Sequence, residues 1–203
     1  MFDPAYFDQV FYDDPIASKG ATRNQNGPTY RDVANVIANL YGGQKLRMVD
    51  VGCGVGWVPK NLQDAGERCD GIEVSEYAVT HSVVPIHRGD VRTLDQLRWT
   101  WDVVICERVL GYLPEADIPR ALRALHAAAP LAYLGIITTD HERYKSCGEA
   151  YHRQNGRQTF RPCSWWFAQM QQAGFQLDVP RLKKLNVIRP GWHEQGVWPL
   201  VGA

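Results

Sequence analysis

The sequence predicts an α/β fold with a mostly parallel sheet, and three observations carry that prediction. First, apolar runs typical of buried strands alternate with segments whose apolar residues have helical spacing. Second, residues 46–66 read as a strand, a glycine turn and a helix, the opening unit of many nucleotide-type sites. Third, 203 residues with 45% hydrophobic side chains suit one globular domain, expected over residues 1–203.

Composition narrows the classes of function. The chain has 22 basic and 22 acidic residues, so its formal net charge of zero speaks against a nucleic-acid binder. The five cysteines form no C-x-x-C pair and the six histidines lack ligand spacing, so we expect no metal. No signal peptide and no run of about 18 apolar residues is visible, which predicts a cytoplasmic protein without a membrane partner.

The N-terminal segment, residues 1–28, combines a group of four aromatic residues at positions 6–12 with a polar, glycine-containing linker. Four aromatic side chains within seven positions are not expected to stay in water. The segment is therefore either a tail laid on the surface or a lid over the glycine turn, with Tyr6, Tyr12 and Tyr30 as candidate wall residues. Residues 29–45 should form a helix that Thr29 caps and that carries this segment.

The glycine turn organises the rest of the chain. A mostly apolar strand over residues 46–51 breaks into Gly52, Gly54 and Gly56, a spacing that suits a turn. Glycines there let the backbone approach a bound molecule where a Cβ would clash. A helix follows, with apolar residues at helical spacing up to Ala65 and with Gly66 after its end.

Further elements follow in order along the chain. The expected strands are residues 68–74, 83–87, 101–106, 131–138, 175–179, 183–187 and 197–201. Ser75 should cap a short helix, Pro114 should begin one, and another should run from Pro162 to Gly174. Residues 140–162 are long and polar, and we expect them to form a functional loop.

Two families of nucleotide-type proteins use such a glycine turn. A dinucleotide oxidoreductase would have G-x-G-x-x-G with its last glycine at position 57, where this chain has the bulky Trp57. The order Asp50-x-Gly52-x-Gly54-x-Gly56 instead resembles the first motif of class I S-adenosylmethionine (SAM) methyltransferases. Glu73, Asp90 and the stretch 107–113 (ERVLGYL) match further points of that family's pattern.

The resemblance covers about residues 46–179 and implies a fold and a cofactor site. The fold would be a Rossmann-like, seven-stranded sheet of order 3-2-1-4-5-7-6, mostly parallel with one antiparallel strand and with helices on both faces. SAM would bind with its methionyl end at the glycine turn, its ribose on Glu73 and its adenine near Asp90. The implied cofactor-binding residues are Asp50, Gly52, Cys53, Gly54, Glu73, Val74, Asp90, Val91, Glu107 and Tyr30.

The acceptor is expected to be a small molecule or a sugar. The stretch after the fourth strand, Cys106-Glu107-Arg108, lacks both the Asp/Asn-Pro-Pro-Tyr of amino-directed DNA methyltransferases and the Pro-Cys of cytosine-C5 enzymes. His141, Glu107 and Tyr112 are the candidate catalytic residues, with His141 the best general base on intrinsic pKa unless it is a plain surface histidine. The alternatives are an inactive SAM-binding or partner-binding protein of this fold and an NAD-dependent oxidoreductase. The acceptor atom and the oligomeric state stay open.

Overall fold

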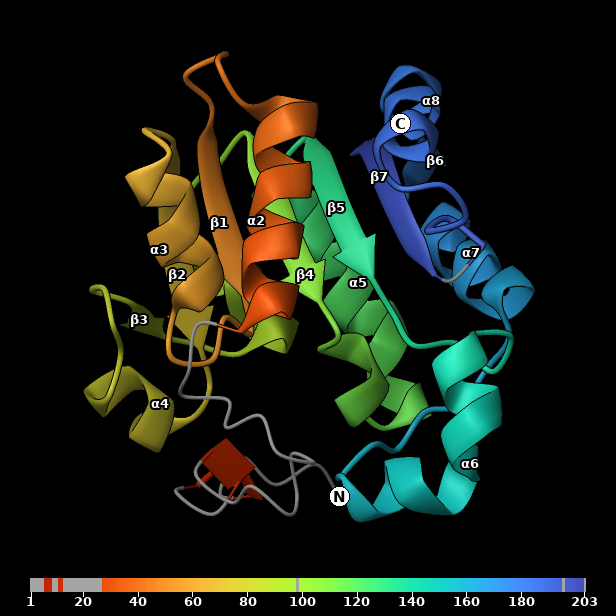
Figure 1. Ribbon diagram of the computed structural model, residues 1–203. Helices are drawn as coiled ribbons and strands as arrows, with labels where there is room; N and C mark the ends of the chain where they lie inside the picture. Colours follow the sequence, from red (N-terminus) through yellow and green to blue (C-terminus); the bar gives the residue numbers. More distant parts are fainter. Residues whose placement is uncertain (1–5, 9–10, 13–26, 98, 195, 203) are drawn as a thin grey trace. The chain divides into compact units, whose positions relative to one another are not determined.

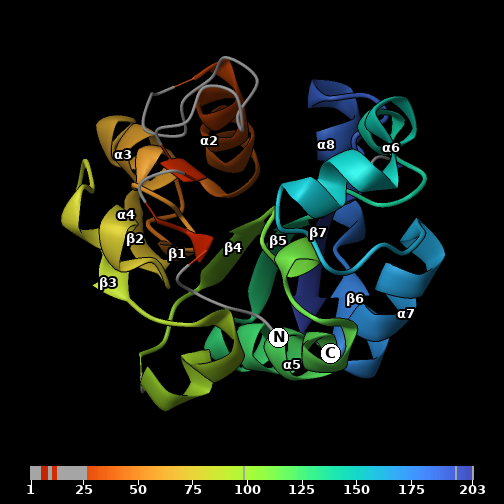
Figure 2. The ribbon, with the colours of Figure 1, turned by 90° about the horizontal axis from the view of Figure 1, so that it is seen from below.

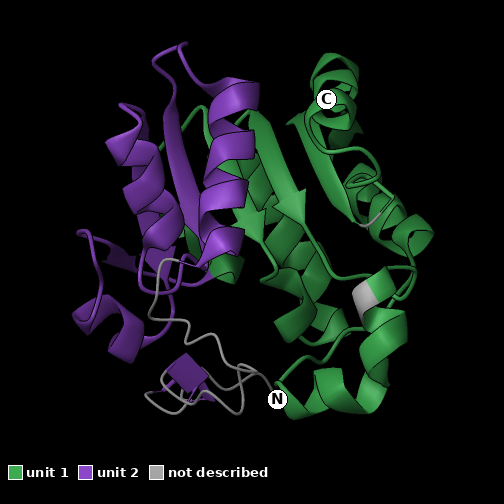
Figure 3. Cartoon of the chain, viewed as in Figure 1, with its two compact units in different colours: residues 1–2, 91–203 green, residues 3–90 purple. Residues whose placement is uncertain are grey.

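The computed structural model describes residues 6–8, 11–12, 27–97, 99–194 and 196–202, which fall into two compact units. Unit 2 comprises residues 3–90, and unit 1 comprises residues 1–2 and 91–203 (Figure 3). Among the described residues, no helix is both long and apolar enough to cross a membrane.

Unit 2 contains three parallel strands and the helices between them (Figure 1). Its elements are α2 (Pro28–Tyr41), β1 (Arg47–Val51), α3 (Trp57–Asp64), β2 (Arg68–Glu73), α4 (Glu76–Thr80) and β3 (His87–Arg88). The last four residues of β1 are buried, as expected of a strand covered on both faces. The apolar residues of helix α2 are buried. The helix packs against α3 (Figure 2).

Unit 1 holds the other four strands. Its strands are β4 (Val103–Glu107), β5 (Leu131–Gly135), β6 (Phe175–Leu177) and β7 (Val197–Gly202). Strands β4 and β5 are parallel, whereas β7 runs antiparallel to both β5 and β6. Its helices are η2 (Val91–Leu97), η3 (Leu110–Tyr112), η4 (Glu115–Asp117), α5 (Ile118–Ala128), α6 (Glu142–Gln154), α7 (Cys163–Gln172) and α8 (Val179–Ile188).

The strand order is β3-β2-β1-β4-β5-β7-β6, the order that the family resemblance implied. The fourth strand is buried up to Cys106, so this thiol is part of the core, as expected. Trp166 and Met170 are the buried face of α7 and Leu185 is the buried residue of α8. The predicted seven-stranded, mostly parallel α/β fold with one antiparallel strand is confirmed.

Four predicted elements differ from the structure. Most of the expected loop 140–162 is the helix α6. Its sequence is polar because most of its residues face solvent. The helix has a break at Gly148 (φ 76°). The expected strand 183–187 lies within α8, whose first turn Asp178 caps by accepting a hydrogen bond from Arg181 N–H. The expected strand 83–87 is only His87–Arg88, and α2 begins at Pro28 after Gly27, so Thr29 lies inside the helix instead of capping it.

Candidate functional site

The glycine turn after β1 has a backbone that only glycine adopts readily. Gly52, Gly54 and Gly56 have φ of 77°, 57° and 90°, all in the left-handed region. The turn is anchored to the end of β2, because the N–H groups of Gly52 and Cys53 both donate to Ile72 O, at 2.7 and 3.2 Å. Gly56 then serves as the residue before α3. The turn thus presents backbone beside the tip of β2.

Glu73 is the last residue of β2, and only 5% of it is exposed. Its Oε2 accepts a hydrogen bond from Gly54 N–H (2.8 Å), while its Oε1 accepts from the N–H groups of Val74 (2.8 Å) and Ser75 (2.9 Å). Burial raises the pKa of Glu73, and the three N–H donors oppose that rise. A carboxylate has about four acceptor positions, so Oε2 keeps one for a further donor such as a ribose hydroxyl.

Asp50 and Cys53 flank this carboxylate. Asp50 is 3% exposed and lies opposite Gly71 in the β1–β2 register. Burial, followed by the charges of Asp50 and Glu73, raises the pKa of the Cys53 thiol well above its ordinary value. The raised pKa favours the neutral thiol of Cys53.

Asp90 and Val91 follow β3. Gly89 N–H donates to Glu73 O at 2.9 Å, which holds the chain just before Asp90 beside the tip of β2. Asp90 and Val74 are half-buried, and Val91 is buried at the start of η2. Two of the residues predicted to contact adenine, Asp90 and Val74, are thus partly exposed.

One aromatic residue of the N-terminal segment, Tyr12, lies over the glycine turn. Of the predicted lid, 1–28, the structure describes residues 6–8, 11–12 and 27–28, and the remainder lies outside the described residues. The N-terminal aromatic cluster consists of Tyr6, Phe7, Phe11 and Tyr12, with neighbouring rings packed edge to face. Tyr12 Cε1 lies 3.5 Å from where a Cβ on Gly54 would stand, and its ring stacks on Tyr77 of α4. Tyr30 lies in the first turn of α2 and is half-buried.

Unit 1 carries a second carboxylate at a strand end, Glu107. Its side chain is 16% exposed, and Oε1 lies 3.1 Å from Nε of Arg108. Oε2 is buried and has no hydrogen-bond partner within the described part of the chain. It lies over Gly135, where a Cβ would stand 1.6 Å away, so only glycine leaves room for this rotamer.

Arg157 is a residue of this site that the sequence did not reveal. It is 8% exposed, and its guanidinium carbon stands 4.8 Å from the centre of the Tyr112 ring. Its Nη1 lies 2.8 Å from where a Cβ on Gly111 would be. Arg157 follows the Asn155-Gly156 pair that ends α6, a recognisable turn signal, but nothing in the pattern marks its guanidinium as buried.

Electrostatics ties Glu107 to these arginines. Burial raises the pKa of Glu107, while the charges of Arg108 and Arg157 work against the rise. The structure thus brings Glu107, Tyr112 and Arg157 into one cluster, which we call the Glu107 cluster together with Arg108. His141 lies at the start of α6, where its carbonyl accepts from Tyr144 N–H and Lys145 N–H, and its side chain is half-buried.

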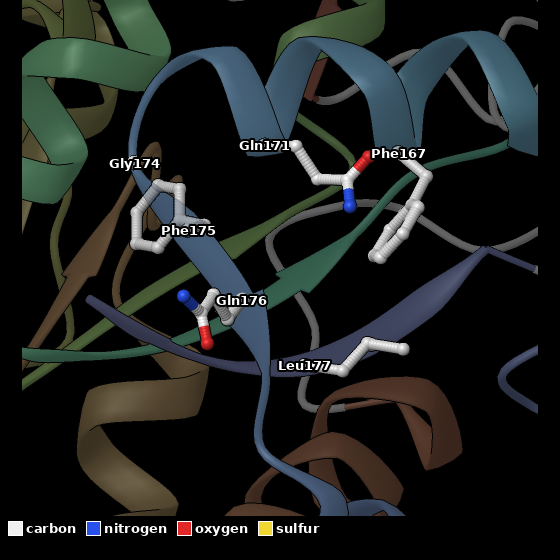
Figure 4. A pocket seen from close by; sticks show the side chains of 6 residues that line it. All are labelled: Phe167, Gln171, Gly174, Phe175, Gln176 and Leu177. Carbon is white, nitrogen blue, oxygen red and sulfur yellow. The ribbon is translucent and has the colours of Figure 1, made fainter. Parts of the chain in front are cut away.

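A separate hollow of unit 1 lies beside the edge strand β6 (Figure 4). No predicted catalytic or cofactor-binding residue lines it, so we assign it no part in the chemistry. Its lining residues are Phe167, Gln171, Gly174, Phe175, Gln176 and Leu177.

Comparison with known proteins decides the family. A family model described as "Methyltransferase domain" matches residues 21–178. The chain belongs to this family. The predictions of a class I methyltransferase and of an enzyme are thereby confirmed, whereas the individual site residues stay predictions. A search of curated proteins finds no match.

The solved structures of CcbJ and ChlM share the fold of this methyltransferase. The CcbJ methyltransferase from Streptomyces caelestis matches over 100% of both chains at 16% identity, with a TM-score of 0.69. Magnesium protoporphyrin IX methyltransferase (ChlM) from Synechocystis PCC 6803, with bound SAH, matches over 98% of both chains at 19% identity and a TM-score of 0.67. CalS10, a SAM-bound amino pentose methyltransferase from Micromonospora echinaspora, is 26% identical over 58% of this chain and 54% of its own, with a TM-score of 0.46.

Proposed function

We propose that this methyltransferase transfers a methyl group from SAM to a small-molecule or sugar acceptor. The prediction of SAM as cofactor is confirmed by the family match and is consistent with ChlM, whose structure contains SAH. The observation that carries the proposal is Glu73, a buried carboxylate held by an N–H of the glycine turn with one acceptor position left.

The cofactor residues lie in unit 2 and at the start of unit 1. Glu73 accepts a hydrogen bond from the ribose, and the glycine turn with Asp50 holds the methionyl end. Asp90 accepts from the adenine amino group, and Val74 and Val91 contact the ring. The bound SAM supplies an electrophilic methyl group on a sulfonium. Every protein group named here either accepts a hydrogen bond or offers backbone and apolar surface, which suits a cationic ligand with two ribose hydroxyls.

The candidate base of unit 1 is Glu107, in the Glu107 cluster. Glu107 Oε2 would accept the proton of an acceptor O–H or N–H while the acceptor oxygen or nitrogen takes the methyl group, the sulfonium C–S bond breaks and SAH leaves with its electron pair. Burial has raised the pKa of this carboxyl, which makes it a stronger base than an exposed glutamate. Tyr112 and Arg157 form the adjacent wall. His141 is the alternative base, and its position at the start of α6 supports it less directly.

The N-terminal aromatic cluster is proposed to act as a lid, on the strength of the described residues 6–8 and 11–12. The Tyr12 ring stands over Gly54 of the turn and would separate a ligand there from water. The support for this part of the proposal is the contact of Tyr12 with the glycine turn and with Tyr77.

Two measurements test the proposal against its alternatives. Calorimetry with the full chain should show SAM binding in the micromolar range and no binding of NAD. Measurable NAD binding without SAM binding would overturn the proposal in favour of an oxidoreductase. Mass spectrometry should then detect methylated products within a panel of small molecules and sugars. SAM binding without turnover of any acceptor, including small-molecule extracts, would leave an inactive SAM-binding protein.

A further inference from the structure

Ser75 occupies a position between the carboxylate of Glu73 and the N-terminal segment. Its backbone N–H donates to Glu73 Oε1 at 2.9 Å. Its hydroxyl accepts from Ala78 N–H at 3.1 Å, which caps α4, and donates to Phe7 O. The residue is 1% exposed. The sequence predicted the cap alone, so the bond to Phe7, 68 residues away, is an additional use of the hydroxyl.

The same short stretch joins three parts of the candidate site. Glu73 holds Gly54 of the glycine turn and Ser75 through its two oxygens. Ser75 in turn holds Phe7, whose ring packs edge to face on Phe11. Phe11 packs on Tyr12, and the Tyr12 ring stands over Gly54 again. The contacts therefore form a closed loop from the carboxylate, through the N-terminal aromatic cluster, back to the turn.

We propose that Ser75 is a positioning residue that couples binding of SAM at Glu73 to docking of residues 6–8 and 11–12, with Tyr12 over the glycine turn. This inference rests on the proposed function for the identity of the ligand. A ligand hydroxyl that donates to Glu73 restricts the carboxylate. It thereby restricts Ser75, whose backbone N–H donates to Glu73 Oε1. A fixed Ser75 presents its hydroxyl to Phe7 O and places Tyr12 over Gly54. Because such coupling is reciprocal, a docked N-terminal segment raises the affinity for SAM by the same factor.

Substitutions at Ser75 separate this role from helix capping. Glycine is nearly as good an N-cap as serine, whereas alanine is a poor one, and both lack the hydroxyl that donates to Phe7 O. Threonine keeps both the cap and the donor. If the bond to Phe7 matters, Ser75→Gly and Ser75→Ala should both raise the dissociation constant of SAM about fivefold to tenfold, the effect of one hydrogen bond. Ser75→Thr should stay close to wild type.

Hydrogen exchange supplies a readout that a capping role would not change. In the free protein, amides of residues 6–8 and 11–12 should exchange faster in Ser75→Gly than in wild type. SAM or SAH should slow them in wild type and less so in the variant. Thr80→Ala removes a different hydroxyl of α4, which bonds to the carbonyls of Glu76 and Tyr77 and to Nδ1 of His81, and should alter neither exchange nor affinity. Tyr12→Leu combined with Ser75→Gly should weaken SAM binding by less than the product of the two single effects.

Several outcomes would overturn the coupling. Wild-type affinity in Ser75→Gly with a loss confined to Ser75→Ala would reduce Ser75 to a helix cap. A loss of affinity with unchanged exchange in residues 6–8 and 11–12, or losses that multiply with Tyr12→Leu, would confine the action of Ser75 to Glu73. Failure of wild type to bind SAM would refute the proposed function instead, and the exchange of the free Ser75→Gly protein would still test the bond to Phe7.

Discussion

Two carboxylates end two strands of this methyltransferase, and they differ in what holds them. Glu73 ends β2 in unit 2, and three backbone N–H groups donate to its oxygens. Glu107 ends β4 in unit 1, where one oxygen meets Arg108 and the other has no hydrogen-bond partner within the described residues. Burial raises the pKa of both carboxyls. The same residue type at equivalent strand ends therefore has two different environments.

This difference indicates which of the two carboxylates is suited to proton transfer. Three backbone N–H donors occupy three of the about four acceptor positions of Glu73, which suits an anchor for one ribose hydroxyl but leaves little room for a substrate proton. The free Oε2 of Glu107 leaves an acceptor position that a substrate proton can occupy. Arginine side chains, which are more mobile than backbone, balance its charge. We therefore interpret Glu73 as the binding carboxylate and Glu107 as the reactive one.

Glu107→Gln should produce the largest effect. The amide keeps the shape and a contact with Arg108 but cannot take up a proton, so kcat should fall about 100-fold, the lower range for general base catalysis. The dissociation constant of SAM should change little. Glu115→Gln alters an exposed carboxylate that pairs with Arg161 and serves as the control, with unchanged turnover. Turnover near wild type in Glu107→Gln together with its loss in His141→Gln would transfer the role of base to His141.

Glu73→Ala should produce the second largest effect, on binding and not on the chemical step. Loss of a charge-assisted hydrogen bond of about 2 kcal/mol should raise the dissociation constant of SAM about 30-fold. Calorimetry measures this effect, and saturating SAM should restore much of kcat. Glu76→Ala removes an exposed carboxylate three residues away that pairs with Arg88, and its affinity should match wild type. Equal affinities in the two variants would show that Glu73 only supports the turn.

The sequence predicted Glu73 better than it predicted the surroundings of Glu107, and the reason is physical. Asp50, the glycines and Glu73 lie within 24 residues of one strand-turn-helix-strand unit, where local backbone rules fix the geometry. The partners of Glu107 come from far along the chain: Gly135 lies under its carboxylate, and Arg157 follows α6. Such contacts depend on tertiary packing, which no local pattern encodes. The sequence likewise shows no apolar periodicity that would predict α6, because most residues of this helix are polar and exposed.

The smallest expected effect is on thermal stability, which should change in opposite directions when Glu107 and Glu73 are each replaced by glutamine. Burial raises the folded-state pKa of Glu107. The contribution of this group to folding stability is therefore fully present below the unfolded-state pKa and is lost as the pH rises through the folded-state pKa. Gln has no charge to desolvate, so Glu107→Gln should melt slightly above wild type near neutral pH. This difference should shrink as the pH falls through the raised folded-state pKa and should be gone below about 4.3, the ordinary pKa of glutamate. Thermal melts between about pH 4 and pH 8 measure it.

Glu73→Gln should show the opposite sign at neutral pH. Its side-chain NH₂ would face N–H donors that now meet carboxylate oxygens, so at least one buried backbone donor would lose its acceptor. The melting temperature should therefore fall although the desolvated charge is gone. A Glu107→Gln variant that also melts below wild type at neutral pH would mean that Arg108 and Arg157 stabilise the Glu107 carboxylate by more than its burial costs. Glu107 would then be held by its surroundings as Glu73 is, and its assignment as the reactive carboxylate would lose its physical basis.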